Sequence, residues 1–574
     1  MTELFIDNKS VTLPQGLDLK IKQQNPLITK NGTFTLDLTL SLLERNNSIL
    51  YKHIERLQAA AAFDNRKALL ISDGHIIING TEAFISNTNE EVKIQLLSGN
   101  SELNYFMGTD AYISSLDLGA ETDLSNERLN QVVKKSFPET PFCTPMVKIG
   151  GTIYNEHPEM ELDIVLDKPY TFSNVAIQPF LLAMIEKILT ALGYSIEFNE
   201  AKDDNFLPHI FILNNDKSGQ YNKVLPGWKV KEFLEECEKL MNIIFVIDNI
   251  KRSVRILCAS NNNRNGTYTI NNVLDTFERT TVDDNPDVSY KNVCYDFPST
   301  TEYKYQCIDD EVLEKAVINT SETYNDLLTK LRDSNGSLLP DNIGDQLYTS
   351  LYLWYVTETD TYYIVDKKTY YFPGSVTNAS YTYYYLRKVH TFRKYQSNKD
   401  DDYLKLSFFP AIYYWREHDP MYVLSQRMPY LPGSNNKEEK DEHQIKKLIE
   451  NGVSNFNSSK KPVALSSFYA TIYGTYFAQN DNVEEDDKSG SWYIKSYGTF
   501  RLTGPEGMVK RYYQANQEID FTREYTIKFI TNTMPDVQAE FILNNKLFIC
   551  KELEYRITND GIHPEVTGTF YEVK

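Results

Sequence analysis

The chain has 574 residues, of which 41% are hydrophobic and 24% charged, as in an ordinary globular protein. Roughly four domains are expected at this length. Asp and Glu number 79 against 59 Lys and Arg, so the net charge of −20 excludes a chain-wide affinity for the phosphate backbone of nucleic acid.

Residues 1–136 are predicted to form an N-terminal β-domain. A hairpin is expected at residues 4–13, with the polar run Asp7-Asn8-Lys9 at its turn. Residues 34–40 alternate apolar with polar side chains, which predicts one strand with a solvated face. A short helix is predicted over about residues 47–62.

Further strands complete this predicted domain. They are expected at residues 68–71, 76–78, 83–85 and 92–97. Asp73-Gly74 and Asn79-Gly80 are predicted as turns between them. The expected outcome is a closed or nearly closed antiparallel β-domain over about residues 1–110.

Residues 137–275 carry the clearest helical pattern. Apolar side chains recur at helical spacing from Ile177 to Leu192, which predicts one helix. Pro179 suits its first turn, and Gly193 stands where a left-handed residue often ends a helix. A strand is predicted directly afterwards.

A second helix-then-strand unit follows in the same region. Its apolar stripe runs from Val230 to Met241 and leads into strands at residues 243–247 and 254–257. The two units predict an α+β domain in which helices cover an antiparallel sheet. A nucleotide-binding βαβ fold is excluded, because no glycine-rich phosphate loop joins a strand to a following helix.

The remaining half is predicted to be β-rich, with a Tyr-rich domain at 276–430 and a C-terminal β-domain with polar loops at 431–574. A weak helix is expected at 322–331, and exposed loops at 434–447 and 479–491. The expected strands are 351–357, 361–365, 369–372, 379–386, 468–477, 492–497, 525–530, 540–543, 547–549, 553–557 and 566–571.

Two tight turns are predicted in the C-terminal domain, at Asn544-Asn545 and at Asn559-Asp560-Gly561. The predicted fold class is therefore mainly β with an α+β domain. We expect a multi-domain chain whose β-domains are antiparallel barrels or sandwiches.

The sequence contains no recognised catalytic or metal-binding motif. The eight histidines never lie within four residues of one another, and the six cysteines form no CxxC pair. No HExxH, GxSxG or GxxxxGK[ST] is present. We therefore predict a non-enzymatic protein with no catalytic residues, no metal and no cofactor. The six cysteines are predicted to be free thiols of a protein that is made in a reducing cytoplasm.

A carbohydrate-binding or carbohydrate-cleaving receptor-recognition protein is the alternative. Two catalytic carboxylates about 5 to 10 Å apart need no fixed spacing in sequence. Trp354, Trp415, Trp492 and the tyrosines at 381–385 are aromatic groups on which sugar rings could stack. Aromatic residues at alternate positions of a strand more often fill a sheet face.

Several stretches, spread over much of the chain, resemble the tail hub or baseplate hub proteins of tailed bacteriophages, especially those of Bacteroidetes phages and prophages. They are packing patterns rather than catalytic motifs. The stretches are 25–32 (NPLITKNG), 35–38 (TLDL), 178–182 (QPFLL), 192–196 (LGYSI), 227–234 (GWKVKEFL), 242–248 (NIIFVID) and 546–555 (KLFICKELEY).

This resemblance implies a structural protein of the virion, assembled in the cytoplasm of the bacterial host. Such proteins form a ring, commonly a trimer, that joins the tail tube to a tip or spike. The implied partners are further copies of the chain, the tail tube, the tape-measure protein and the tip or spike protein. Exposed edge strands can be paired across such a ring. No membrane segment is expected, because no window approaches about 18 apolar residues. No specific nucleic-acid binding is expected, because the net charge is −20.

Overall fold

The computed structural model describes the chain in segments. They are residues 1–58, 66–108, 111–132, 135–156, 171–248, 251–259, 266–274, 277–281, 293–295, 336–338, 352–356, 361–371, 380–389, 404–416, 425–431, 463–466, 472–474, 500, 508–513 and 519–573.

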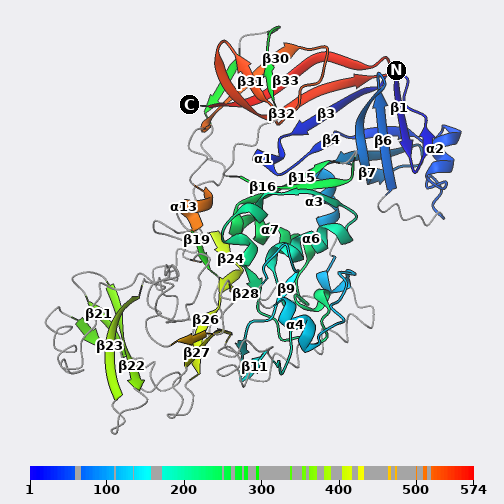
Figure 1. Cartoon of the computed structure of the whole chain (residues 1–574). Coiled ribbons are helices and arrows are strands. Elements are labelled where there is room, and N and C mark those ends of the chain that lie inside the picture. The colour runs from blue at the N-terminus through cyan, green and yellow to red at the C-terminus, as the bar shows by residue number, and fades with distance from the viewer. Residues whose placement is uncertain are drawn as a thin grey trace.

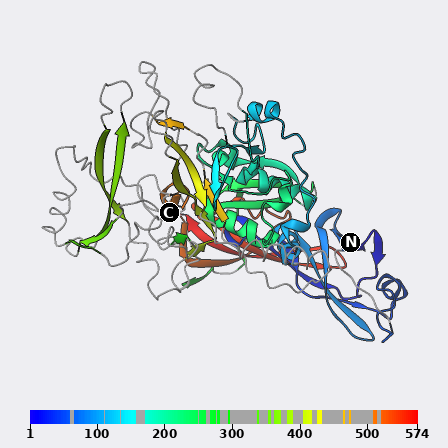
Figure 2. The ribbon, with the colours of Figure 1, turned by 90° about the horizontal axis from the view of Figure 1, so that it is seen from below.

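The described chain is mainly β, with helices concentrated in its middle, as the sequence predicted. Figure 1 shows strands from both ends of the chain side by side in one upper layer, above a helical unit. A separate four-stranded sheet, formed by residues 336–338, 352–356, 361–371 and 380–389, stands apart from both, which the view from below in Figure 2 also shows.

Fourteen of the described strands form one large sheet. Its strands from the N-terminal part are β1 (Thr2–Ile6), β2 (Lys9–Val11), β3 (Asp18–Gln24), β4 (Thr33–Thr35), β5 (Leu38–Ser41), β6 (Arg66–Ser72), β7 (His75–Asn87) and β8 (Glu91–Ser98). Its later strands are β17 (Thr267–Thr269), β18 (Glu278–Thr281), β30 (Ile519–Ile530), β31 (Glu540–Leu543), β32 (Lys546–Thr558) and β33 (Ile562–Val573).

The two ends of the chain meet where β3 pairs with β32. The antiparallel register runs from Asp18 opposite Thr558 to Gln24 opposite Glu552. Side chains from both ends then pack into one hydrophobic core, in which Ile21 and Ile557 are fully buried. The domain limits at 136 and 431 stay predictions, but strands of the first and last predicted domains share one sheet and one core.

Three of the predicted turns are confirmed, because residues in each of them have the positive φ angles that tight turns need. Asp7 and Asn8 connect β1 to β2 with φ of 48° and 61°. Asn544 and Asn545 connect β31 to β32 with φ of 51° and 60°. Gly561, between β32 and β33, has φ of 145°. Asn and Gly adopt such angles at low cost, which explains why sequence signals located these turns.

The predicted turn at Asn79-Gly80 is wrong, because both residues lie inside the long strand β7. Gly80 meets a different requirement. A Cβ atom built on it would stand 1.9 Å from the carbonyl oxygen of Leu97 on β8. The glycine therefore permits a close approach of two paired backbones rather than a reversal of the chain.

Gly80→Ala should force β7 and β8 apart and lower the free energy of unfolding by about 3 kcal/mol, at the upper end of the usual cost of overpacking. Urea unfolding would measure the change. Gly16→Ala is the matched control, because no atom lies within 4 Å of a Cβ built at Gly16 and its φ is not positive. Equal stability of the two variants would contradict the close-approach explanation.

Two other local predictions need correction. The helix expected at 47–62 is α2 (Arg45–Leu50), and turns follow it because Lys52 and His53 have φ of 52° and 58°. The strand expected at 34–40 is broken into β4 and β5. Its break allows the Thr35 hydroxyl to accept a hydrogen bond from Leu96 N at 2.9 Å.

The middle of the chain forms an α+β unit, in agreement with the predicted helix-strand units. Its main helices are α6 (Leu181–Ala191) and α7 (Val230–Met241), and its strands are β13 (Ser195–Asn199), β15 (Ile243–Asp248) and β16 (Ser253–Cys258). The sheet is mixed rather than antiparallel. β16 lies between the other two strands, pairing antiparallel with β15 and parallel with β13.

The prediction that Pro179 lies in the first turn of α6 is wrong. Pro179 lies in the short strand β12 (Gln178–Pro179), which pairs with β9 (Phe142–Cys143). The helix starts at Leu181. Gly193 does end it, with φ of 90°. The buried faces of α6 and α7 share one core, to which Phe408 from a distant strand adds a ring stacked on Trp228 at 5.2 Å.

Smaller elements complete the described chain. The helices are α1 (Pro26–Thr29), α3 (Asn100–Gly108), α4 (Asn126–Val132) and α13 (Met508–Tyr513). The strands are β10 (Val147–Ile149), β11 (Thr152–Tyr154), β14 (Phe211–Ile212), β19 (Val293–Tyr295), β20 (Gly336–Leu338), β21 (Tyr352–Val356), β22 (Thr361–Tyr371), β23 (Ser380–Val389), β24 (Leu404–Leu406), β25 (Phe408–Pro410), β26 (Ile412–Arg416), β27 (Ser425–Leu431), β28 (Val463–Ser466) and β29 (Ile472–Gly474).

Several predictions fall outside the described residues. They are the helix at 322–331, the strand at 492–497 and the polar loops at 434–447 and 479–491. Within the described residues, no helix combines the length and the apolar character needed to cross a bilayer.

Candidate functional site

The segment 25–32 joins the large sheet to the α+β unit. Asn25, 1% exposed, lies before α1 and accepts a hydrogen bond from Leu27 N at 3.1 Å. Its Nδ2 atom donates to the carbonyl oxygens of Val537 at 3.2 Å and Cys550 at 2.9 Å. One buried amide therefore fixes the start of α1 and holds it against β32 of the large sheet.

The other side of the same segment contacts the α+β unit. Leu27 packs against Ile244 and Val246 of β15. Lys30 Nζ lies 2.7 Å from the Glu238 carboxylate on α7. Burial raises the pKa of Glu238, and the nearby Lys30 ammonium only partly opposes this rise. Eight residues thus contact two units that are far apart in sequence.

A second link is made by Asn100 at the start of α3. Its side chain accepts a hydrogen bond from Ile247 N at 3.0 Å and donates another to Phe245 O. The amide therefore bonds to β15 as a neighbouring strand would. Gly32 permits the close approach of segment 25–32 to the start of α3, because a Cβ there would stand 2.6 Å from Asn100 N.

A polar surface, here called the charged face, covers the side of β3, β32 and β33 that points away from the core. It consists of Lys20, Lys22, Glu552, Glu554, Thr567 and Thr569. Side chains alternate along each strand, so the residues between them are the buried ones. These strands run side by side across the upper layer of Figure 1.

Lysines and glutamates of the charged face are paired across the strands. Lys20 Nζ lies 3.1 Å from Glu554, and Lys22 Nζ lies 2.7 Å from Glu552 and 3.7 Å from Glu554. The hydrogen bond that Lys22 donates to the Glu552 carboxylate raises the pKa of Lys22. Lys22 is therefore cationic at neutral pH, and each of the two lysines is held by a carboxylate.

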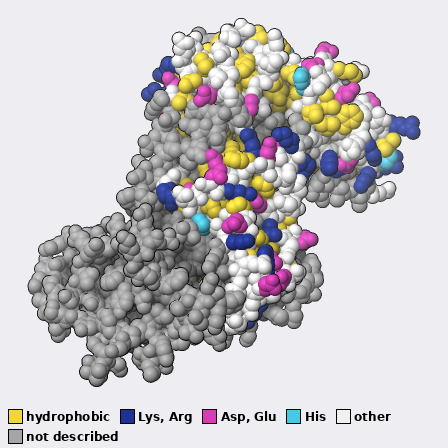
Figure 3. Space-filling model, in the orientation of Figure 1, with side chains coloured by type: hydrophobic (Ala, Val, Ile, Leu, Met, Phe, Trp, Pro, Cys, Tyr) yellow, Lys and Arg dark blue, Asp and Glu magenta, His cyan; other side chains and the backbone are white. Residues whose placement is uncertain are grey.

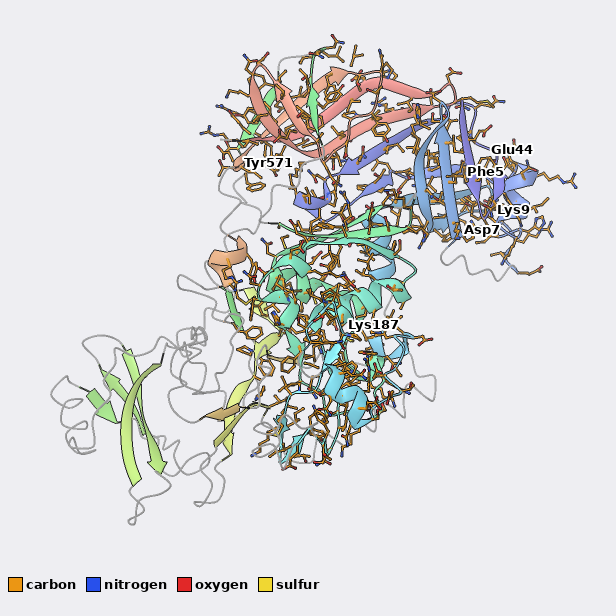
Figure 4. All side chains as sticks on the ribbon, viewed as in Figure 1. Phe5, Asp7, Lys9, Glu44, Lys187 and Tyr571 are labelled. Carbon is orange, nitrogen blue, oxygen red and sulfur yellow. The ribbon has the colours of Figure 1, made fainter. Side chains whose placement is uncertain are left out.

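The pairing continues at both borders of the face. Lys551 pairs with Glu524 of β30, which also accepts a hydrogen bond from the Tyr571 hydroxyl at 2.7 Å. Burial raises the pKa of Tyr571 (Figure 4), so its hydroxyl stays protonated and donates this hydrogen bond. At the other end, Arg556 lies 3.4 Å from Asp18.

These ion pairs are partly exposed, and such pairs contribute only about 0 to 1 kcal/mol each to stability. Their chief effect is electrostatic. Over the side of the molecule drawn in Figure 3, basic and acidic side chains of the described residues are interspersed rather than separated. The arrangement neutralises lysines on a continuous surface built from both ends of the chain.

Sequence reasoning predicted no site residues and did not identify the charged face. The signal was present as alternation, with Lys20 and Lys22 in one strand and Glu552 and Glu554 in another. Alternation indicates a polar face, but it does not say which distant strand lies beside it.

The described residues form no metal-binding cluster. No three His, Cys, Asp or Glu side chains among them are arranged to hold a metal ion. Cys143, Cys237, Cys258 and Cys550 are buried and none of the four is in a disulfide bond, in agreement with the prediction of thiols that are not oxidised to disulfides. The predicted absence of catalytic and cofactor-binding residues stays a prediction.

Lys187, labelled in Figure 4, has a packing role in α6. Its Nζ atom lies 4.0 Å from the centre of the Tyr221 ring and donates to the Leu118 carbonyl oxygen at 3.3 Å. Burial lowers its pKa. These contacts hold two loops against the helix.

Comparison with known proteins gives little. No family model and no curated protein matches the sequence. Among solved structures, the prophage MuSo2 43 kDa tail protein from Shewanella oneidensis matches with a TM-score of 0.32 and 6% identity, over 100% of this chain and 97% of that one. A tail protein from Neisseria meningitidis MC58 matches with a TM-score of 0.30 and 7% identity, over 100% and 96%. At these TM-scores, a likeness decides neither the fold nor the function.

Proposed function

We propose that the chain is a structural protein of a bacteriophage tail, and more narrowly a hub or baseplate component that joins the tail tube to the tip or spike. The observation that carries the proposal is where the hub-like stretches lie. Stretch 25–32 contacts stretch 546–555 through Asn25 and Cys550, and stretch 242–248 through Leu27 and Val246. Sequence stretches that resemble one family thus form one packed junction.

In this role the chain performs no catalysis and takes no cofactor. Its partners are further copies of itself in a ring, taken to be a trimer, together with the tail tube, the tape-measure protein and the tip or spike protein. The ring belongs to the virion and assembles in the host cytoplasm. Edge strands such as β18, whose four residues are all exposed, are surfaces that a neighbouring copy can cover.

The mass of the purified chain in solution tests this function. Light scattering over a dilution series should give a multiple of the 66.4 kDa chain mass, and negative-stain averages should show a closed ring. A homogeneous monomer at every concentration would contradict the ring. A monomer that also binds a sugar in a glycan panel would favour the carbohydrate-binding alternative.

A further inference from the structure

Arg252, which lies just before β16, has an unfavourable backbone conformation. Its φ of 51° falls in the left-handed region, where glycine and asparagine fit at low cost and other residues are strained. Glycine would remove this strain, so the turn itself does not call for arginine. Strained positions of this kind persist where the residue has a task of its own. The contacts of the guanidinium group therefore indicate what Arg252 does.

The guanidinium group reaches from the α+β unit to a buried carboxylate on α3. Arg252 Nη1 lies 3.6 Å from Oε1 of Glu102, which is 1% exposed. The same oxygen accepts a hydrogen bond from the hydroxyl of Thr81 on β7 at 2.7 Å. One carboxylate is thus held from two sides, by the large sheet through Thr81 and by the α+β unit through Arg252.

Tyr194, which follows Gly193 at the end of α6, holds the guanidinium group in place. Arg252 Cζ lies 5.1 Å from the centre of the Tyr194 ring, close enough for a cation–π contact. Tyr194 is 1% exposed, and its hydroxyl has no hydrogen-bond partner among the described residues. This residue therefore contributes its ring to Arg252. A Cβ built on Gly193 would lie 3.9 Å from Arg252 Nη2, so the end of the helix also borders the group.

We infer that Arg252 is an electrostatic latch that fixes the α+β unit against α3 and β7, and that rising ionic strength loosens it. The latch consists of Arg252, Glu102, Thr81 and Tyr194. The inference goes beyond the proposed tail function and does not rest on it, because the latch joins two parts of one chain.

The two charged members of the latch are exposed to different degrees, which makes it both firm and responsive. Glu102 is buried, so opening leaves a carboxylate without its counter-charge, and the closed arrangement is favoured. Arg252 is 39% exposed, so dissolved ions screen its charge. The neighbouring Lys251 does not replace it, because the Lys251 ammonium pairs with Glu197 at 3.1 Å and Asp248 at 3.8 Å.

Arg252→Gly tests the latch on the full-length chain, because it removes the guanidinium group and the backbone strain together. Hydrogen exchange at the Ile247 amide reports the junction, since that amide bonds to Asn100 Oδ1 at 3.0 Å. Amides in the middle of α7 are the internal reference. If Arg252 served only the turn, glycine would leave exchange at Ile247 unchanged or slow it. The latch predicts exchange at least about tenfold faster at Ile247, with the α7 amides unchanged.

Lys251→Gly is the matched control, because it removes one cation from the same turn. Lys251 is 62% exposed and its ion pairs do not reach α3 or β7. Exposed pairs contribute little, so exchange at Ile247 should change by less than about threefold. Unchanged exchange in Arg252→Gly, or equal acceleration by Lys251→Gly, would overturn the inference.

The salt response of the wild type keeps the test decisive if Arg252→Gly does not fold. Raising the salt concentration from about 0.1 to about 1 M shortens the Debye length from about 10 to about 3 Å. Exchange at the Ile247 amide should then speed up relative to the α7 amides. Folded Arg252→Gly has no latch left to screen and should lack this response. A wild type whose junction exchange ignores salt would also defeat the latch, whether the chain is a monomer or a ring.

Discussion

Replacing Arg66 with methionine should lower the free energy of unfolding by about 3 to 5 kcal/mol, the usual cost of breaking a buried ion pair on one side. Arg66 donates from Nε to Glu82 at 2.6 Å and from Nη2 at 2.8 Å. The Glu82 side chain has no exposed surface and also accepts the Tyr51 hydroxyl at 2.5 Å. Without Arg66, a carboxylate stays buried without its counter-charge.

The double variant Arg66→Met with Glu82→Gln provides the control. The neutral amide can still accept the hydrogen bond from Tyr51, and it leaves no buried charge behind. We therefore expect the double variant to recover at least half of the loss, as measured by urea unfolding. A double variant as unstable as Arg66→Met would mean that packing by Arg66 over the Tyr51 ring, 4.4 Å away, dominates instead.

The same pair predicts a pH dependence. Burial raises the pKa of Glu82 above its ordinary value, while Arg66 acts to lower it. A carboxyl whose pKa is higher in the folded state favours folding below its unfolded pKa, and this contribution is lost as pH rises through the folded pKa. Arg66→Met removes the lowering influence, so its stability deficit should shrink as pH falls from 7 toward 5. The double variant lacks this carboxyl and should show no such change.

Local features of the fold could be predicted from the sequence because their causes are local. The α7 helix follows from apolar spacing between Val230 and Met241, and the structure places it at those residues. The turn at Asn544-Asn545 follows from the ease with which Asn takes positive φ. Each of these features is set within a few neighbouring residues.

Long-range pairing could not be predicted, because alternation in one strand does not identify its neighbour. β3 and β32 lie more than 500 residues apart, and nothing in either strand names the other. The Asn79-Gly80 prediction failed for the same reason. Gly80 is required by its close contact with the backbone of Leu97 on the next strand, whereas the sequence signal was interpreted as a local turn. The charged face was missed because it exists only once those strands pair.

Asn25→Ala should loosen the junction between the large sheet and the α+β unit at a cost of about 3 kcal/mol or more. The substitution leaves two buried carbonyl oxygens, of Val537 and Cys550, and the Leu27 N–H without their partner. Each unsatisfied buried group costs about 1 to 3 kcal/mol. Urea unfolding gives the total, and hydrogen exchange at the Leu27 amide reports the junction itself.

Asn25→Asp separates hydrogen bonding from shape in that experiment. Aspartate fills the same volume, but it presents an oxygen where Nδ2 donates to two carbonyl oxygens, so it should be at least as destabilising as alanine. Asn46→Ala is the matched control, because Asn46 is exposed and its Nδ2 donates a long hydrogen bond of 3.4 Å to the Thr12 hydroxyl at the surface. That control should change stability by less than about 0.5 kcal/mol. A stable Asn25→Asp variant would mean that packing of the segment, and not the buried amide, holds the two units together.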